Sequence, residues 1–296
     1  MTRHGADGGV VWRPVPLITG QWRFGGAIGI DLGGRGIKLC IPPDRLRRSA
    51  RRRAPAGMFA HAPTPADGAY AAATPSLIAR LLADAPLRRQ PRRHAAVVAL
   101  PASLTRDCIR PCPPATDPVA AIRHLRAELA RHMELPVAEG AVDFLASGGG
   151  DGVRVVAARR EAVAGVARLV DEVGLRPAAV DAAGFALERL AALHAGANAM
   201  GVVDLGVAES RVALARRGEG LGHRTAGREP ETIRAAVSAL EAEAGERAAA
   251  VMVVGGGASA EAAGRLGGSL ARPCRAAGSW APLWLAWTLA LRREAI

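Results

Sequence analysis

Two stretches of the chain repeat one pattern of apolar and polar positions. Residues 28–41 and 201–214 each begin with an apolar run, continue with Asp-Leu-Gly, and end in a second apolar run. The connection between the two runs is too short for anything but antiparallel strands joined by a tight turn. The sequence therefore predicts two strand–turn–strand units about 170 residues apart, and hence two related lobes that face one another.

Elsewhere short apolar runs alternate with amphipathic stretches, which indicates an α/β protein. We predict strands at residues 95–100, 142–145, 153–157, 178–180 and 249–254. A helix should begin with Thr74 as N-cap and Pro75 at its first position. We predict further helices at residues 118–133, 159–173, 184–194, 230–244 and 282–293, and one that begins near residue 259. We interpret residues 1–26 as a loose arm, 44–65 as an exposed loop with a short strand at 58–59, and 108–118 as a proline-rich connection.

The first turn carries residues suited to binding an anion. Gly33 and Gly34 permit backbone conformations that present several N–H groups to one phosphate. Lys38 is the only lysine among 39 basic residues and supplies a compact positive charge beyond the turn. Asp31 ends the first strand, and beside phosphates a carboxylate requires a divalent cation, or water held by one. An ordinary glycine hairpin without a ligand is the alternative from these residues alone.

Two further glycine sites extend this prediction. Asp204 and Gly206 repeat the first turn in the second half of the chain. A glycine triplet follows a buried strand and precedes a helix, at Gly255, Gly256 and Gly257. A turn of this kind lets the backbone lie against the flat face or the phosphates of a ligand.

These sites together predict one nucleotide clamped between the two lobes. No Walker A loop occurs, and the first glycine turn leads into a strand rather than into the helix of a dinucleotide-binding unit. The two Asp-Leu-Gly turns would hold phosphates and Mg²⁺, with Asp31 and Asp204 as ligands through water, and the glycine triplet would hold the adenosine. Asp181, at the end of a strand, would orient water near the γ-phosphate. For each aspartate alone, a strand-end turn residue is the alternative.

Composition narrows the function classes. The chain has a net charge of +12, but its arginines are dispersed and only 3% of its residues are aromatic, so we expect no nucleic-acid partner. Its four cysteines form no CxxC pair, which favours reduced thiols over a zinc site. No signal peptide or membrane-spanning run is evident, and we expect a soluble, cytoplasmic protein. The arginine-rich residues 45–53 leave a contact with an acidic partner or anionic lipid open.

Several stretches of the sequence together resemble a known protein family. The two hairpins and the late glycine triplet look like the phosphate-1, phosphate-2 and adenosine motifs of the actin-like ATPase superfamily, which includes actin, sugar kinases and FtsA. Within it, the chain is most similar to the PilM family of type IV pilus assembly proteins. The stretches that carry the resemblance are residues 28–39, 97–104, 134–136, 142–144, 156–160, 174–177, 180–181, 185–189 and 289–292.

The resemblance implies an α/β, two-lobed actin-like (ribonuclease H-like) ATPase fold. Residues 1–25 would be an N-terminal arm, 26–198 lobe I with an FtsA-type inserted subdomain at about 101–177, and 199–296 a reduced lobe II. The protein would be a cytoplasmic scaffold, peripheral to the inner membrane, that binds the N-terminal segment of a PilN-like membrane protein. That peptide would lie against the inserted subdomain and the first subdomain. Self-association is left open.

The chain also departs from the family pattern. Residues 206–249 are too few for the helical subdomain that normally closes one side of the purine site. ATP with Mg²⁺ would therefore be bound structurally or vestigially, with at most weak hydrolysis. The alternative is an enzyme, an actin-like ATPase or small-molecule kinase with Asp181 or Asp204 as base, although the reduced lobe II leaves little room for a substrate domain.

Overall fold

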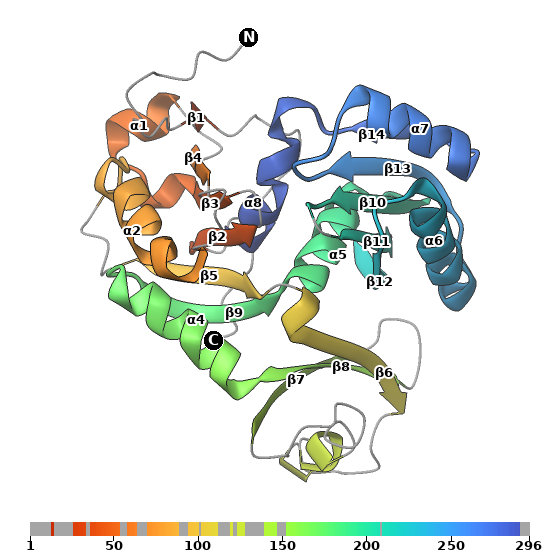
Figure 1. Cartoon of the computed structure of the whole chain (residues 1–296), viewed down its shortest axis with the longest axis horizontal. Helices are drawn as coiled ribbons and strands as arrows, with labels where there is room; N and C mark the ends of the chain where they lie inside the picture. Colours follow the sequence, from red (N-terminus) through yellow and green to blue (C-terminus); the bar gives the residue numbers. More distant parts are fainter. Residues whose placement is uncertain are drawn as a thin grey trace.

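The computed structural model of the 296-residue chain describes residues 13–14, 26–33, 36–53, 58–63, 70–88, 94–100, 102–111, 119–120, 123–127, 139–146, 152–207 and 209–290. Within this part, two mixed sheets with helices on their faces lie side by side, and a third sheet lies below them in the view of Figure 1. We call the unit built on the six-stranded sheet lobe I, the unit built on the five-stranded sheet lobe II, and the three-stranded sheet the small sheet.

Lobe I is built around the first predicted hairpin, β2 (Ile28–Gly33) and β3 (Gly36–Ile41). With β1 (Arg13–Pro14), β4 (Met58–Pro63), β5 (Ala95–Leu100) and β9 (Arg176–Ala182), the strand order is β1-β4-β3-β2-β5-β9. Side chains alternate between the two faces of a strand. One face packs on α2 (Tyr70–Ala83) and α4 (Arg160–Glu172), and the other packs on α8 (Trp284–Ala290).

Lobe II is built around the second predicted hairpin, β10 (Ala199–Leu205) and β11 (Ser210–Arg216). β12 (Glu219–Ala226), β13 (Ala248–Val254) and β14 (Cys274–Ala276) complete the order β12-β11-β10-β13-β14. One face is covered by α6 (Pro230–Ala244) and α7 (Ala260–Leu270), and the other by α5 (Ala183–His194). Each Asp-Leu-Gly segment therefore lies at the end of the first strand of a hairpin, one in each lobe.

Two helices join the lobes. α5 follows the last strand of lobe I and packs on β10 and β11 of lobe II through Leu187, Leu190 and Ala191. α8 follows the 3₁₀ segment η5 (Gly278–Leu283) at the end of lobe II and packs back on lobe I. Its backbone lies so close to β2 that a Cβ at Gly29 would be 1.9 Å from the carbonyl oxygen of Ala286. Both helices therefore fix how the two hairpins face each other.

The small sheet consists of β6 (Thr105–Pro111), β8 (Gly152–Arg159) and β7 (Gly140–Ala146), in that order. Both pairings are antiparallel, and a small cluster around Leu125, Val153 and Val155 forms its core. It lies within residues 101–177, the predicted inserted subdomain. The helix α4, which is also within that range, packs on the sheet of lobe I instead. The domain boundaries remain predictions.

Most predicted elements agree with the structure. Both hairpins and the strands β5, β7, β8, β9 and β13 lie where the sequence predicts them, as do α4, α5 and α6 within a residue or two. α7 begins after Ser259, whose hydroxyl accepts a hydrogen bond from the Ala262 N–H, and Gly174 follows α4 with a φ of +81°. Of the predicted helix 118–133, the described residues 119–120 and 123–127 are helical. Residues 291–293 of the predicted last helix lie outside the described part.

Three predicted segments are wrong. Residues 44–65 contain the 3₁₀ turn η1 (Pro43–Arg45), the helix α1 (Arg48–Arg53) and the full strand β4, because pairing with β3 buries Phe59, Ala60 and Ala62. α2 begins at Tyr70, so Thr74 is a buried helical residue rather than the N-cap. Of the predicted connection at residues 108–118, residues 108–111 belong to the strand β6 because β8 supplies the pairing, and residues 112–118 lie outside the described part. β6 follows the 3₁₀ segment η3 (Ala102–Leu104).

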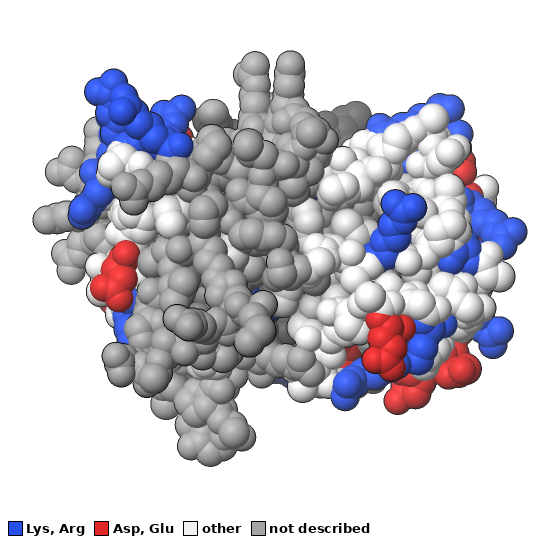
Figure 2. Space-filling view, turned by 90° about the horizontal axis from the view of Figure 1, so that it is seen from above, with Lys and Arg blue, Asp and Glu red and all other residues white. Residues whose placement is uncertain are grey.

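The surface carries its arginines in several groups. Arg48, Arg51 and Arg52 are exposed on α1, and Figure 2 shows basic side chains at both ends of one face, with acidic side chains at both ends as well. That no nucleic acid binds stays a prediction.

None of the helices within the described residues has both the length and the apolar character that a membrane crossing requires.

Candidate functional site

The first hairpin places a buried ion pair beside its turn. Asp31 and Lys38 lie directly opposite each other in the β2–β3 register, and the Lys38 Nζ donates to Asp31 Oδ2 at 2.6 Å. The two residues are 5% and 8% exposed. A Cβ at Gly33 would be 2.7 Å from Lys38 Nζ, so a side chain there would displace the ammonium group from this position. Gly34 lies outside the described residues.

The second hairpin repeats this arrangement with an arginine. Asp204 lies opposite Arg211 in the β10–β11 register, and Arg211 Nη1 lies 3.3 Å from Asp204 Oδ2. Its other terminal nitrogen lies 3.5 Å from Glu209 Oε1. A Cβ at Gly206 would be 2.4 Å from the Glu209 carbonyl oxygen, so the tight turn needs glycine there.

Arg211 was not among the residues predicted from the sequence. The signal was present, however, because both hairpins follow Asp-Leu-Gly with a basic residue seven positions after the aspartate. In a hairpin with this turn length, that spacing puts the two side chains on one face of the sheet and opposite each other.

The two hairpins and the glycine triplet lie close together. Burial raises the pKa of Asp204, the charge of Arg211 opposes this effect, and the charge of Asp31 in the other lobe adds to it. Gly255 has a φ of +91°, and a Cβ there would be 2.2 Å from Asp204 Oδ1. The Gly257 N–H donates to the Leu205 carbonyl at 3.0 Å, which holds the Gly255–Gly257 turn against the end of β10.

The ion pairs of the two hairpins do not favour a bound divalent cation. Lys38 and Arg211 supply two positive charges, and Arg211 Nε is buried with no acceptor within the described residues. The predicted Mg²⁺ ligands, Asp31 and Asp204, each face a cation of the protein itself. Across the described residues no group of three or more metal-ligating side chains occurs. While these pairs hold, the two carboxylates do not fit a bound Mg²⁺, and the two basic residues are occupied by the carboxylates of Asp31, Asp204 and Glu209.

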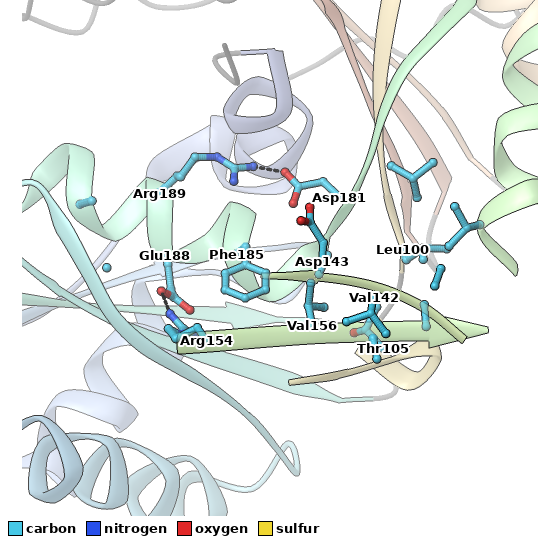
Figure 3. A pocket seen from close by; sticks show the side chains of 18 of the residues that line it. Leu100, Thr105, Val142, Asp143, Arg154, Val156, Asp181, Phe185, Glu188 and Arg189 are labelled. Carbon is cyan, nitrogen blue, oxygen red and sulfur yellow. Dashed lines mark hydrogen bonds and ion pairs between the residues drawn. The ribbon is translucent and has the colours of Figure 1, made fainter. Parts of the chain in front are cut away.

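Asp181 lies apart from the two hairpins, in a cavity. It is 7% exposed at the end of β9 and forms an ion pair with Arg189 of α5. The two residues line a cavity of about 500 Å³ whose lining includes neither Asp31, Lys38, Asp204 nor the glycine triplet. Figure 3 shows the Asp181–Arg189 pair at one side of this cavity. The prediction that Asp181 orients water beside a γ-phosphate remains untested.

The cavity lies between lobe I and the small sheet, with one edge formed by lobe II. Its apolar wall combines β5, β7, β8, α4 and β9, through Leu100, Val142, Val156, Val163 and Val180. Phe185 and the Arg154–Glu188 pair line another side (Figure 3), and Gly218 and Gly220 of lobe II complete it. Such a combination of apolar walls with a few polar groups is typical of a ligand-binding cavity.

Four charged side chains meet beside this cavity, and we call them the ionic cluster: Asp107, Arg154, Glu188 and His223. Arg154 donates to Glu188 and lies 3.5 Å from an Asp107 oxygen. His223 pairs with Glu188, and its Nε2 lies 3.3 Å from Asp107 Oδ1. The four come from β6, β8, α5 and β12, so the cluster connects the small sheet to lobe II. The cluster was not predictable from the sequence, because these residues share no local motif.

Burial alone would lower the pKa of His223, but hydrogen bonds and charges from Asp107 and Glu188 outweigh it and raise the pKa to about 9. Two glycines make room for the cluster. A Cβ at Gly184 would be 2.1 Å from His223 Nε2, and a Cβ at Gly220 would be 2.5 Å from a Glu188 oxygen. α5 and β12 therefore interlock, each placing a charged side chain against a glycine of the other.

Comparisons with known proteins find similarity at the level of structure. No protein-family model matches the chain, and no curated protein matches its sequence. A chain of the PilM-PilN type IV pilus biogenesis complex matches with a TM-score of 0.65 and 20% identity, over 92% of this chain and 99% of that one.

Two other solved structures extend this result. A Bacteroides thetaiotaomicron protein with an actin-like ATPase fold and unknown function matches with a TM-score of 0.55 and 10% identity, over 90% of this chain and 95% of that one. The cytoplasmic domain of EpsL, an inner membrane component of the Vibrio cholerae type II secretion system, matches with a TM-score of 0.51 and 12% identity, over 77% and 81%. The chain thus has the two-lobed actin-like ATPase fold, and over almost its whole length its structure is similar to a chain of the PilM-PilN complex.

Proposed function

We propose that this protein is an actin-like scaffold of a type IV pilus or related secretion platform. In this role it binds the N-terminal segment of a PilN-like inner-membrane protein at the cytoplasmic face of the membrane. The observation that carries the proposal is the cavity of about 500 Å³ between lobe I and the small sheet. It lies where the family resemblance puts the partner peptide, in a fold similar to a chain of the PilM-PilN complex.

The lining of the cavity supports a peptide as its occupant. Aliphatic side chains from five elements form one wall, and burial of apolar side chains from an extended segment there would favour binding. The ion pairs Asp181–Arg189 and Arg154–Glu188 lie at its sides. The pairing of Asp181 with Arg189 also favours the scaffold over an ATPase or kinase with Asp181 as its base, because a base must be free to accept a proton.

In this proposal a nucleotide has a structural role at the facing hairpins. Lys38 and Arg211 would contact the phosphates, and the Gly255–Gly257 turn would lie against the adenosine. A bound nucleotide adds negative charge that holds the two basic residues from opposite lobes together. Neither the two hairpin sites nor the glycine triplet belongs to the lining of the peptide cavity, so the two binding events are measured separately.

The test uses synthetic peptides with the first 15 or so residues of each short single-span protein encoded beside this gene. Isothermal titration of the full chain should find one peptide that binds. Val142→Glu puts a carboxylate into the apolar wall and should weaken binding about 10- to 100-fold, since an unpaired buried charge costs several kcal/mol. Val119→Glu is the matched control, because Val119 is 60% exposed and outside the cavity lining. Equal losses in both variants, or no binding peptide, would reject the proposal.

A further inference from the structure

A group of arginines lies on and beside α1 in lobe I, and the proposed function does not use it. Four of the six residues of α1 are arginines, and none is acidic. The group, which we call the α1 patch, consists of five exposed residues: Arg47, Arg48, Arg51, Arg52 and Arg88. Figure 2 shows a compact group of basic side chains at the end of the molecule where Figure 1 places α1.

The α1 patch is fixed to lobe I by its own backbone. Leu46 is buried and pairs with Leu87 through a β-bridge, and Arg47 Nε donates to the Leu87 carbonyl oxygen at 2.9 Å. The Arg88 N–H donates to the Arg45 carbonyl oxygen at 2.8 Å. Arg88 is thereby brought beside the start of α1, although it lies about 40 residues later in the chain.

α1 turns its basic face to solvent. Ala50 packs on the core of lobe I. With 3.6 residues per turn, positions 47, 48, 51 and 52 then project from the opposite side of the helix. Two pairs of like charges are four residues apart, a spacing that disfavours the helix, so an approaching anionic surface relieves repulsion within the patch.

The protein does not balance this charge within the described residues. No ion pair there involves any of the five arginines, and the acid nearest to them in sequence, Asp44, pairs with Arg45. On α7, by contrast, the exposed Arg265 pairs with Glu261 one turn earlier. The unbalanced charge is therefore a property of this surface and does not follow from an arginine-rich composition alone.

The chemistry of the α1 patch indicates which kind of anion it fits. A protein interface has a core of apolar or aromatic side chains, and single-stranded nucleic acid is bound by stacking on aromatic side chains. Among residues 47–52, the exposed side chains are those of four arginines and Ser49. A surface of anionic lipid headgroups requires only positive charge, and clusters of basic residues bind membranes in this way.

We propose that the α1 patch docks this protein on the anionic headgroups of a membrane surface. The choice of a membrane over other polyanions rests on the proposed function, which places the protein at the cytoplasmic face of the membrane. Figure 1 shows α1 on the side of lobe I away from the small sheet, so docking leaves the peptide cavity uncovered. The patch supplies a second attachment in addition to the partner peptide.

Sedimentation of the full chain with lipid vesicles tests this inference. We expect binding to vesicles of phosphatidylcholine with about one-third phosphatidylglycerol, and none to phosphatidylcholine alone. Raising the salt concentration from about 0.1 M to about 1 M should abolish binding, because the screening length falls to about 3 Å. The triple variant Arg48→Ala/Arg51→Ala/Arg52→Ala should bind about 100-fold more weakly, since each arginine contributes about fivefold, and alanine keeps the helix.

The triple variant Arg228→Ala/Arg234→Ala/Arg247→Ala is the matched control. These three arginines are exposed in lobe II, so the control has the same net charge as the first variant and keeps the α1 patch. Its binding to vesicles should stay within about twofold of the unaltered protein, because attraction to the membrane falls off within a screening length.

No binding to the anionic vesicles, or equal losses in the two triple variants, would overturn the inference. Tighter binding of duplex DNA or polyglutamate than of vesicles at equal charge concentration would also overturn it, and would identify a nucleic acid or an acidic protein as the partner. The peptide titration is a separate measurement. Peptide binding without vesicle binding would reject the docking alone, and vesicle binding without peptide binding would reject the scaffold alone.

Discussion

The ionic cluster makes the stability of this protein depend on pH through His223. In the folded chain Asp107 and Glu188 raise its pKa to about 9, against about 6.5 in an unfolded chain. Because the folded pKa is the higher one, the stabilisation is fully present below pH 6.5 and is lost as the pH rises through 9. The difference between the two pKa values corresponds to about 3 kcal/mol.

The perturbation is a change from pH 6 to pH 10, compared between the unaltered protein and His223→Gln. Glutamine keeps a hydrogen-bond donor but has no charge to lose in this range. The free energy of unfolding, measured with urea, should fall about 3 kcal/mol further in the unaltered protein than in the variant. Arg154 remains charged throughout, so Glu188 keeps one cationic partner when His223 becomes neutral.

His194→Gln serves as the matched control. Burial lowers the pKa of His194, so its titration lies below pH 6.5 and its replacement should leave the alkaline difference unchanged. The reasoning would be refuted if the unaltered protein and His223→Gln lost the same stability between pH 6 and pH 10. That result would mean that His223 is neutral in the folded protein and that Arg154 alone compensates the two carboxylates.

Three further substitutions test the close contacts of the fold. Gly184→Ala should lower the melting temperature and cost about 1–3 kcal/mol, although alanine usually favours a helix, because its Cβ would collide with His223. Lys38→Met should cost about 3–5 kcal/mol in urea unfolding by leaving Asp31 buried and unpaired, and adding Asp31→Asn should recover most of it; no recovery would mean that the lysine acts through packing. Gly29→Ala should cost about 3 kcal/mol or more and change the tryptophan fluorescence of α8, since its Cβ would meet the helix backbone; an unchanged spectrum would contradict this packing.

Much of the fold follows from local sequence. The two hairpins were predictable because their apolar runs are separated by only a few residues, so that the chain has no other way to pair them. α7 was predictable from Ser259, whose hydroxyl can reach the N–H groups of the first turn. The aspartates of both turns were predictable because each follows an apolar run directly, which marks the end of a strand in the sequence.

Other features depended on partners far away in the chain. Arginines and prolines flank the residues of β4, which form a strand only because the edge of β3 is free to pair with them. β6 pairs with β8, about 45 residues later. Propensity and periodicity describe near neighbours, and they contain no information on which distant strand supplies the hydrogen bonds.

The candidate sites divide in the same way. The sequence by itself determined that Asp31, Lys38 and Asp204 lie at glycine turns of two equivalent hairpins. The pairing of Arg211 with Asp204 was within reach of the same local pattern. Only the tertiary structure placed Asp181 in a cavity away from these hairpins and brought Arg154 to Glu188 and His223. The physical reason is that the charge and burial of a side chain depend on which groups surround it, and those groups come from elements that fold together only in three dimensions.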